Sequence, residues 1–513
     1  MEELSHFTKL YNEFLAPKEP LYAGQMLWRA ARKWPERIAL ICNNEEITFN
    51  QLYQQASAVS YFLQQQKVVP GDKVMILYEN SLDFYRAYHG AWQVGAVVIP
   101  INTFMHEKEL EHVINDSQPA VLIVSEKLSS KVLQLYKNAR FIITQEELNA
   151  LCANPQQFIP VPLQQHELSV LLYTSGTTGL PKGVMLSSYN CIYNSIQGIA
   201  KFTSQKDDRI LCALPLFHSF MQNACIWSTC LLGAAVIVVP KIDRKALLVG
   251  IACKPTVVLG IPQLFGLFCL LKKLNFSKVR FFICGGDALP DKIRKFFELI
   301  YGRKICNGYG LSETSPFVSV DLDDTRSETN TIGKPLIGIS VQLRDETGKD
   351  ISKTAIGTLW VKGDNTMLGY YNALQATEKI LQDGWLNTGD LARINSQGKL
   401  VICGREKDLI IHNGIKIYPQ EIENCLMQHQ AVQAVGVIGQ ATDDDNEIPV
   451  AYIAAPDYVE KRDELAQELL HLSKQHLAAY KIPRAFIIMR ELPMTATGKI
   501  NKKELRALNA QKS

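Results

Sequence analysis

Short apolar runs alternate with helix-like stretches through the first 240 residues of the chain, and this alternation restricts the fold more than any other feature. Three strand-forming runs, each separated from the next by a helical pattern, are KVMILYE (Lys73–Glu79), AVVIPIN (Ala96–Asn102) and AVLIVSE (Ala120–Glu126). Parallel neighbours in a sheet need a crossover connection, usually a helix. We therefore predict an α/β fold with parallel-type sheets flanked by helices.

The length and the later pattern predict two domains. A chain of 513 residues exceeds the size at which a single hydrophobic core stops growing, about 250–300 residues. Turns multiply between about residues 332 and 403, which indicates a small β-rich subdomain inside a large domain of residues 1–403. Residues 404–513 have the size and the mixed pattern of a small α+β domain.

Composition argues against several classes of protein. Basic residues outnumber acidic ones by only three, 54 against 51, so no nucleic-acid partner is expected. The twelve cysteines form no CxxC pair, which is typical of reduced thiols in a cytoplasmic protein. The polar start is unlike a secretory signal, and the longest apolar stretch (Ala224–Pro240) is too short to span a bilayer. This stretch predicts a core helix that runs into a buried strand, with a peripheral membrane contact as the alternative.

A loop rich in glycine and hydroxyl residues, YTSGTTGLPKG (Tyr173–Gly183), lies between a predicted strand and a predicted helix. Glycines let backbone N–H groups approach a polyanion, hydroxyls add hydrogen-bond donors, and Lys182 adds a cation. The spacing fits neither the Walker A pattern nor the glycine motifs of Rossmann folds and serine hydrolases. A phosphate-binding loop is therefore indicated, and a flexible linker is the alternative from composition alone.

This loop resembles the signature of the adenylate-forming superfamily, which includes acyl- and aryl-CoA synthetases, peptide-synthetase adenylation domains and beetle luciferases. Further motifs in the family's order extend the resemblance from Tyr53 to Arg506, and the chain is most similar to fatty acyl-CoA synthetases. The resemblance implies that the loop holds the β- and γ-phosphates of ATP. The residues to which it assigns this role are Thr174, Ser175, Gly176, Thr177, Thr178, Gly179 and Lys182.

LPLFHSF (Leu214–Phe220) resembles the family segment that lies beside the substrate carboxylate. A lone histidine among apolar residues is more often a core residue, but the resemblance implies that His218 lies next to the acid and acts in catalysis. It also implies that Phe220 and Gly310 line the acid pocket.

Two further motifs resemble the walls of the nucleotide site. FFICGGDALP (Phe281–Pro290) ends in a Gly-Gly turn, where a flat ligand can lie against bare backbone; a helix cap at Asp287 is the other interpretation. NGYGLSET (Asn307–Thr314) offers Tyr309 for stacking and Glu313 as a ligand for Mg²⁺. By resemblance, the nucleotide contacts are Gly286, Asp287, Ala288, Asn307, Gly308, Tyr309 and Ser312, and Glu313 and Thr314 are catalytic.

The last motifs surround the predicted domain boundary. Asp390 resembles the aspartate that accepts the ribose hydroxyls of ATP, and Arg405 completes the ribose and phosphate contacts. Lys407 matches the hinge on which the small domain turns. Lys499 matches the lysine that stabilises charge at the phosphoryl centre, and Gly414 matches the place where the pantetheine arm of coenzyme A passes.

The resemblance implies a ligase with ATP, Mg²⁺ and coenzyme A as cofactors and co-substrates. It would form an acyl-adenylate, release pyrophosphate, and transfer the acyl group to the thiol. The stretch after His218 carries no acidic residue that could pair with a substrate ammonium, so a hydrophobic acid is expected, a fatty acid before an aryl acid. The alternatives are an acyl-AMP ligase that loads an acyl carrier protein and a non-catalytic acyl- or nucleotide-binding relative.

Overall fold

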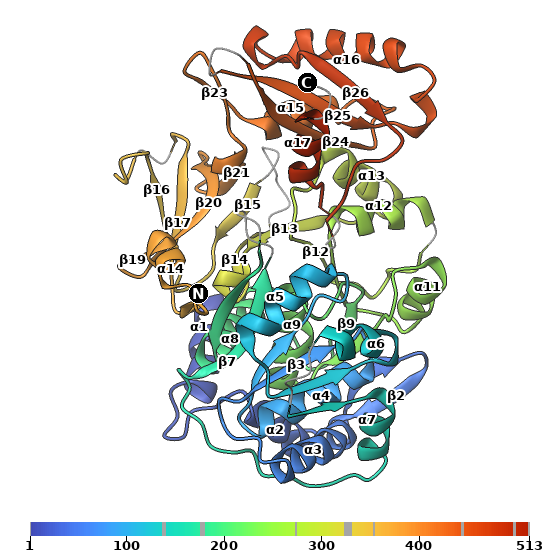
Figure 1. Cartoon of the computed structure of the whole chain (residues 1–513), viewed down its shortest axis with the longest axis vertical. Helices are drawn as coiled ribbons and strands as arrows, with labels where there is room; N and C mark the ends of the chain where they lie inside the picture. The colour runs from blue at the N-terminus through green and yellow to red at the C-terminus, as the bar shows by residue number, and fades with distance from the viewer. Residues whose placement is uncertain are drawn as a thin grey trace.

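The computed structural model describes residues 2–135, 140–174, 180–271, 274–322, 331–351, 354–442, 446–495 and 499–510. It has the predicted α/β fold, with two large sheets, helices packed on them, and a smaller α+β unit at the C-terminal end (Figure 1).

The first large sheet has seven strands in the order β18-β8-β7-β4-β3-β5-β6. Five of these strands, β7, β4, β3, β5 and β6, are parallel, as the alternating pattern predicts. Strands β8 and β18 add antiparallel pairs at the other edge. The bounds are β3 (Lys73–Leu77), β4 (Val97–Pro100), β5 (Val121–Val124), β6 (Phe141–Ile143), β7 (Leu168–Thr174), β8 (Lys182–Ser187) and β18 (Gly369–Tyr370).

The second sheet has a parallel part, made of β1, β10, β9, β11, β12 and β13, and an antiparallel part that begins at β14. The segment predicted as a β-rich subdomain is antiparallel. Its first strand, β15, pairs with β14 on one side and with β21 on the other, so that the segment continues this sheet. The bounds are β1 (Ile38–Cys42), β2 (Glu45–Thr48), β9 (Arg209–Cys212), β10 (Ala235–Val238), β11 (Val257–Gly260), β12 (Phe281–Cys284), β13 (Ile305–Gly310), β14 (Phe317–Asp321), β15 (Thr331–Pro335), β16 (Ser340–Arg344), β17 (Gly357–Lys362), β19 (Leu381–Gln382), β20 (Trp385–Ile394) and β21 (Leu400–Arg405).

Two helices in the core, α4 (Leu82–Gln93) and α8 (Ser188–Phe202), are buried on almost every face. Ser81 and Ser187 cap their first turns, because each side chain accepts a backbone N–H that has no partner within the helix. Both helices join strands of the two sheets in one apolar cluster. The remaining helices of the larger body are α1 (Glu2–Phe14), α2 (Gln25–Lys33), α3 (Phe49–Gln65), α5 (Glu107–Ser117), α6 (Glu126–Leu135), α7 (Gln145–Cys152), α9 (Ser219–Gln222), α10 (Ser228–Leu232), α11 (Arg244–Ala252), α12 (Pro262–Leu271), α13 (Asp291–Tyr301) and α14 (Leu374–Ile380).

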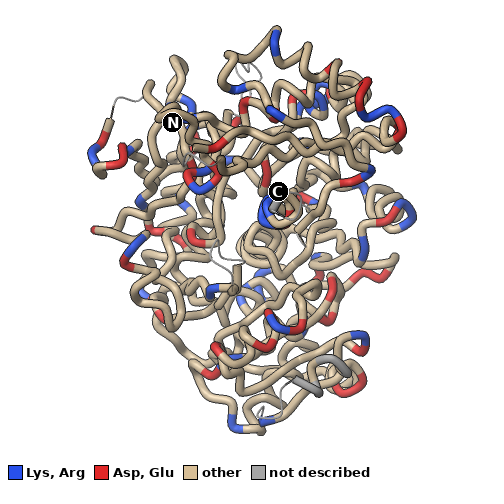
Figure 2. Tube along the Cα trace, turned by 45° about the horizontal axis from the view of Figure 1, so that its top comes forward, with Lys and Arg blue, Asp and Glu red and all other residues tan. Residues whose placement is uncertain are grey.

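The longest apolar stretch, Ala224–Pro240, forms most of a π-helix, η1 (Asn223–Trp227), then α10 and β10, and it is almost entirely buried. The prediction of a core helix running into a buried strand is therefore confirmed. Within the described ranges, no helix is both long enough and apolar enough to cross a membrane. Basic and acidic residues are interspersed along the trace (Figure 2).

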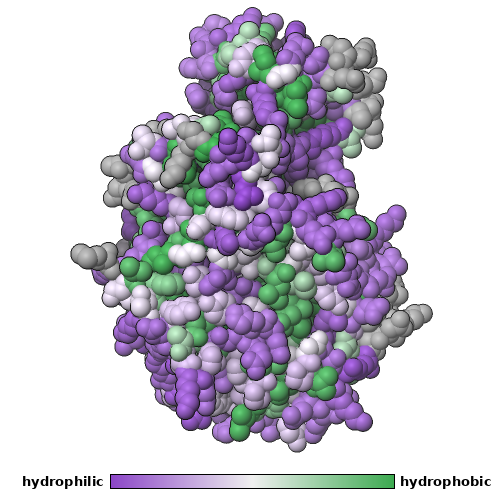
Figure 3. All heavy atoms as spheres, turned by 90° about the vertical axis from the view of Figure 1, so that its left-hand side faces the viewer, coloured by the Kyte–Doolittle hydropathy of each residue, from purple (hydrophilic) through white to green (hydrophobic). Residues whose placement is uncertain are grey.

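The C-terminal unit has its own small cores and appears as a separate lobe above the larger body (Figure 3). It begins with a hairpin of β22 (Ile410–His412) and β23 (Ile415–Ile417). The other elements are a three-stranded sheet of β24 (Ala434–Ala441), β25 (Glu447–Ala454) and β26 (Ala485–Met489), and the helices α15 (Pro419–Leu426), α16 (Arg462–His476) and α17 (Lys502–Ala510).

Candidate active site

Asp390 lies at the centre of the predicted ribose site. Its carboxylate is almost fully buried, at 3% exposure. The Tyr309 hydroxyl donates to one oxygen at 2.5 Å, and Arg405 Nε lies 2.9 Å from the other. A carboxylate oxygen accepts more than one hydrogen bond, so both oxygens retain acceptor capacity for vicinal hydroxyls. The structure thus brings together three of the predicted nucleotide residues, which come from β13, β20 and β21.

Glu313, the predicted metal ligand, is held by the segment around β18. The Tyr370 hydroxyl donates to Glu313 Oε1 at 2.7 Å, and Met367 N donates to the Glu313 carbonyl at 2.9 Å. Burial and the neighbouring Glu313 carboxylate raise the pKa of Tyr370, so that this phenol stays a proton donor. The Lys182 ammonium lies 5.4 Å from the centre of the Tyr370 ring. One tyrosine therefore links the end of the predicted phosphate loop to the predicted metal ligand.

Mg²⁺ commonly binds through one or two carboxylates together with the phosphates of its substrate, rather than in a cage made only of protein ligands. Glu313 is half-buried and faces the same region as Lys182, which fits this mode of binding. In the part of the chain that the structure describes, no group of three or more potential His, Cys, Asp or Glu ligands is found. The residues present therefore fit a metal ion that arrives with ATP.

His218 lies at the start of α9, where its Nδ1 accepts from Phe220 N at 3.4 Å. Burial and the Lys499 ammonium lower the pKa of His218 to about 4, so the ring is neutral at physiological pH. The ring is half-buried. This histidine faces a charged residue of the C-terminal unit, which is unlike the environment of a core residue.

Phe220 packs across the Gly-Gly turn after β12. A Cβ on Gly285 would lie 3.3 Å from the Phe220 ring, and Phe317 makes an edge contact with the same ring at 5.6 Å. Gly310, the other predicted pocket residue, leaves no room for a side chain, because a Cβ there would lie 1.8 Å from the Pro316 carbonyl oxygen. Both glycines therefore let neighbouring groups approach the backbone more closely than a side chain would allow.

Two polar residues follow Phe220 closely in the chain. Gln222 and Asn223 are buried, at 0% and 1% exposure. The Gln222 amide accepts from the Tyr88 hydroxyl and donates to the Phe217 carbonyl, both at 2.9 Å. Asn223 donates to Asn194 at 3.0 Å. Both buried amides therefore have hydrogen-bond partners within the core.

Lys499 reaches this region from the C-terminal unit. The charged groups that act on its ammonium include Asp287, Asp390 and Glu313 of the larger body, and Arg405 at the end of β21. Burial is the main effect, and it lowers the pKa of Lys499. The structure thus places the predicted catalytic lysine beside residues assigned to the adenine, ribose and metal contacts.

Other predicted nucleotide residues have local hydrogen-bond partners. Asp287 Oδ1 accepts from Ala288 N, while α13 begins at Asp291 with Pro290 in the cap position, so Asp287 is not the cap of that helix. Gly286 has a φ of +82° and is exposed, which fits a turn open to a flat ligand. Asn307 donates to the Thr331 carbonyl at 2.9 Å, and Gly308 lies beside it on β13.

The two hydroxyl residues that flank Glu313 point in different directions. Ser312 Oγ lies 3.2 Å from Ser219 Oγ, next to His218. Thr314 is fully buried and donates to the Pro316 carbonyl at 2.7 Å. This geometry gives Thr314 a role in shaping the turn, and a direct catalytic role stays a prediction.

The predicted hinge and thiol channel lie on the exposed side of the C-terminal unit. Lys407 is in a short 3₁₀ turn, and its neighbour Asp408 pairs with Arg506 of α17 at 2.6 Å. Gly414 is in the turn of the β22–β23 hairpin, where Asn413 and Gly414 both have positive φ, at +50° and +73°. Asn-Gly is favoured in such a turn because both residues tolerate this conformation. No heavy atom lies within 4 Å of the Cβ position at Gly414.

Thr174 and Lys182 are paired at the ends of β7 and β8, which brings the two ends of the predicted phosphate loop together. The intervening residues predicted to hold phosphates lie outside the described residues: Ser175, Gly176, Thr177, Thr178 and Gly179.

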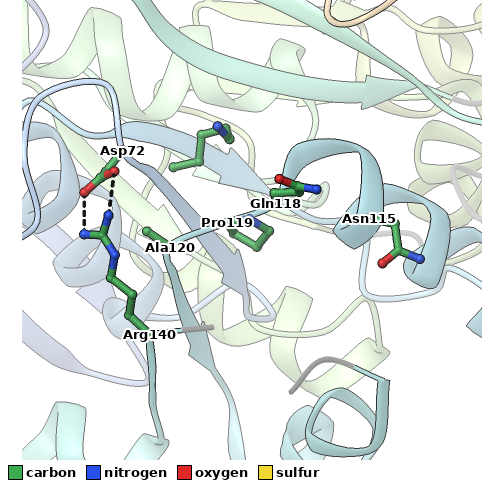
Figure 4. A pocket seen from close by; sticks show the side chains of 7 residues that line it. Asp72, Asn115, Gln118, Pro119, Ala120 and Arg140 are labelled. Carbon is green, nitrogen blue, oxygen red and sulfur yellow. Dashed lines mark hydrogen bonds and ion pairs between the residues drawn. The ribbon is translucent and has the colours of Figure 1, made fainter. Parts of the chain in front are cut away.

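A hollow of about 350 Å³ lies elsewhere, around Arg140 and Lys73 (Figure 4). Arg140 pairs with Asp72 through two nitrogens, at 2.9 and 3.4 Å. None of the predicted site residues lines this hollow.

Comparison with known families decides the class. The family model described as "AMP-binding enzyme" matches residues 27–371, and its C-terminal domain model matches residues 421–499.

The chain belongs to the AMP-binding enzyme family.

Similar proteins of this family have several acids in their names. The long-chain-fatty-acid–CoA ligase of Bacillus subtilis (strain 168) is 30% identical over 94% of this chain and 93% of its own. The feruloyl-CoA synthase of an Amycolatopsis species is 31% identical over 93% of this chain and 97% of its own. The crystal structure of the anthranilate CoA ligase AuaEII with anthranoyl-AMP has a TM-score of 0.89 and 26% identity, over 95% of this chain and 98% of that one. The predicted class, an AMP-forming acid–thiol ligase of α/β fold, is confirmed.

Two residues of this AMP-binding enzyme were missed by sequence reasoning. Tyr370 contacts Glu313, which lies 57 positions earlier in the chain. The segment MLGYYN, which contains Tyr370, is similar to a segment of fatty acyl-CoA synthetases. This similarity is the sequence signal that could have identified Tyr370. Lys292 contacts the C-terminal unit, and only the arrangement of the two units reveals it.

Proposed function

We propose that this enzyme joins a hydrophobic carboxylic acid to coenzyme A through an acyl-adenylate, with ATP as the source of AMP. The observation that carries the proposal is the convergence of Lys499, His218, Glu313 and Asp390 on one region from two separate units of the chain. The acid carboxylate attacks the α-phosphorus of ATP, the bond to the β-phosphate oxygen breaks, and pyrophosphate leaves.

Each residue has a chemical task in this proposal. Asp390 and Arg405 hold the ribose. His218 is neutral because its pKa is about 4, so it can donate a hydrogen bond to the substrate carboxylate without being a competing cation. Lys499 stabilises the negative charge that develops on the phosphoryl oxygens. Mg²⁺, held by Glu313 and the ATP phosphates, would neutralise charge on the leaving pyrophosphate.

In the second half-reaction, the thiol of coenzyme A attacks the acyl carbon and AMP leaves with its oxygen. We infer that the small C-terminal domain turns about Lys407 relative to the large domain. This motion withdraws Lys499 and brings the hairpin of Gly414 towards the site. Gly414 itself has no side chain, and no heavy atom lies within 4 Å of its Cβ position, which leaves room for a slender pantetheine arm.

The acid is proposed to be hydrophobic, with a fatty acid as the first candidate. The CoA ligases most similar to this chain include one named for long-chain fatty acids. A short aromatic acid is the second candidate, because similar CoA ligases are named for ferulate and anthranilate and the Phe220 ring lies against the bare backbone of Gly285.

The test is a panel of acids assayed for AMP formation with coenzyme A, with an acyl carrier protein, and with neither thiol. Fatty acids of about 6 to 16 carbons and cinnamate- and benzoate-type acids cover both candidates. The proposal requires acid-dependent AMP release that increases when free coenzyme A is added. Release that responds only to a carrier protein would identify a carrier-loading ligase instead.

A further inference from the structure

Lys292 of the larger body is hydrogen-bonded to the C-terminal unit in the orientation that brings Lys499 near the site. Lys292 is in the first turn of α13, and its ammonium donates to three carbonyl oxygens of the C-terminal unit: His429 at 3.2 Å, Gln430 at 3.1 Å and Val432 at 3.0 Å. An ammonium has three N–H donors, so this contact uses all of them. In Figure 1, α13 lies directly beneath the C-terminal unit.

The three acceptors form a rigid turn within their own unit. This turn, residues 429–432, follows α15. His429 Nδ1 accepts from Ala431 N at 3.3 Å, and the Val432 side chain is fully buried in the small core. His429 Nε2 also lies 3.1 Å from a Glu468 carboxylate oxygen of α16. Because the turn is fixed to the body of the unit, its carbonyls move together with the unit.

Lys292 and the carboxylate that favours the Lys499 ammonium belong to one short segment of the larger body. Lys292 is five positions after Asp287, whose carboxylate is the first of the charges that favour the Lys499 ammonium. The loop of Asp287 and the first turn of α13 are continuous in sequence. A rotation of the C-terminal unit that withdraws Lys499 would also carry the carbonyls of residues 429–432 away from Lys292.

We propose that Lys292 is a positioning residue that favours the adenylating orientation of the C-terminal unit by capping the 429–432 turn. This inference rests on the proposed two-step function. The contact stabilises the C-terminal unit only in the adenylating orientation, so it shifts the equilibrium towards this orientation and away from the thioester-forming one. Its loss disfavours the half-reaction that needs Lys499 in the site and leaves the other half-reaction unchanged or faster.

The test variant is Lys292→Met, which keeps a long unbranched side chain and removes every donor. Lys295→Met is the matched control, because Lys295 is an exposed lysine of the same helix. We expect acid-dependent pyrophosphate release to slow by about fivefold to tenfold in Lys292→Met, as for the loss of charge-assisted hydrogen bonds at a partly exposed site. Thioester formation from supplied acyl-AMP is expected to match or exceed that of the wild type.

Lys292→Arg supplies a second readout, since a guanidinium can donate to the same carbonyls and should recover part of the lost adenylation rate. Equal slowing of both half-reactions in Lys292→Met, or the same effect in Lys295→Met, would overturn the proposal. Equal melting temperatures of the two methionine variants would confirm that folding is not the cause.

The orientation can also be measured without turnover. Lys416 of the C-terminal unit pairs with Glu346 of the larger body, so cysteines placed at both positions report this orientation through cross-linking with a short bismaleimide. We expect a lower yield of the cross-linked peptide pair in the Lys292→Met background than in the Lys295→Met background. The same yield in both contradicts the proposal, whereas absence of adenylation in the wild type would contradict only the proposed function.

Discussion

Lys499 and His218, which belong to different units of the chain, lie close enough for the ammonium to contribute to lowering the pKa of the imidazole to about 4. Burial of the ring is the larger cause. The pair is separated by 281 positions in sequence, from 218 to 499. In this orientation the C-terminal unit therefore brings the charge of Lys499 near the candidate site.

The depressed pKa of His218 predicts a loss of stability in acid. An unfolded histidine titrates near pH 6.5, whereas His218 in the folded chain titrates at about 4. Between these values the unfolded chain binds a proton that the folded chain does not, so the free energy of unfolding falls as the pH decreases from about 6.5 to about 4. Urea unfolding of the wild type and His218→Gln at pH 7.5 and pH 5 checks this. The variant should lose less stability in acid; equal losses would show that His218 is not responsible.

Tyr370→Phe should raise the concentration of Mg²⁺ required for adenylation by about threefold to tenfold, because the hydrogen bond that orients Glu313 is lost. Tyr371→Phe is the control, since this neighbour instead holds its ring beside Lys73. Titration calorimetry of ATP with and without Mg²⁺ adds a readout independent of turnover. Binding of metal-free ATP should be unchanged in Tyr370→Phe. If Tyr370→Phe binds ATP more weakly to the same extent with and without Mg²⁺, Tyr370 supports the nucleotide site in general rather than the metal ligand Glu313.

Phe220→Ala should extend the range of acids towards longer chains. The ring packs over Gly285 and against Phe317, so its removal opens space directly beyond the predicted carboxylate position. We expect kcat/KM for long fatty acids to rise by about tenfold relative to that for short or aromatic acids, which corresponds to about 1.4 kcal/mol. An unchanged ratio across the panel would place the pocket elsewhere.

Gly414→Leu should spare adenylation and stop thioester formation, because a branched side chain would obstruct the pantetheine arm. The backbone at this position has a φ of +73°, so the substitution also strains the turn. Gly348→Leu is the control for this backbone strain. Gly348 has a φ of +81° in an exposed turn, and no heavy atom lies within 4 Å of its Cβ position. Thioester turnover that survives Gly414→Leu, or that is lost equally in both variants, would contradict a thiol channel at Gly414.

The central strands were predictable because continuous apolar runs leave few alternatives. KVMILYE and AVVIPIN became β3 and β4, shortened by two or three residues at their ends. The candidate site residues come from short motifs, and the structure brings three of them, Tyr309, Asp390 and Arg405, into contact. Their roles stay predictions.

Long-range pairings were not predictable from local patterns. The antiparallel strands after β14 continue the large sheet through β15 and β21, which depends on a pairing between distant segments. Contacts between the two units, such as that of Lys292, depend on how the units are oriented. No periodicity or motif in a single sequence encodes such an orientation.

The most direct test of the proposed chemistry is the exchange of labelled pyrophosphate into ATP, driven by a carboxylic acid in the absence of coenzyme A. The wild type should catalyse acid-dependent exchange. Lys499→Ala should lose it by about 100-fold to 1000-fold, yet still convert supplied acyl-AMP and coenzyme A to thioester and AMP. Absence of exchange with every acid tested, or equal loss of both half-reactions in Lys499→Ala, would contradict it.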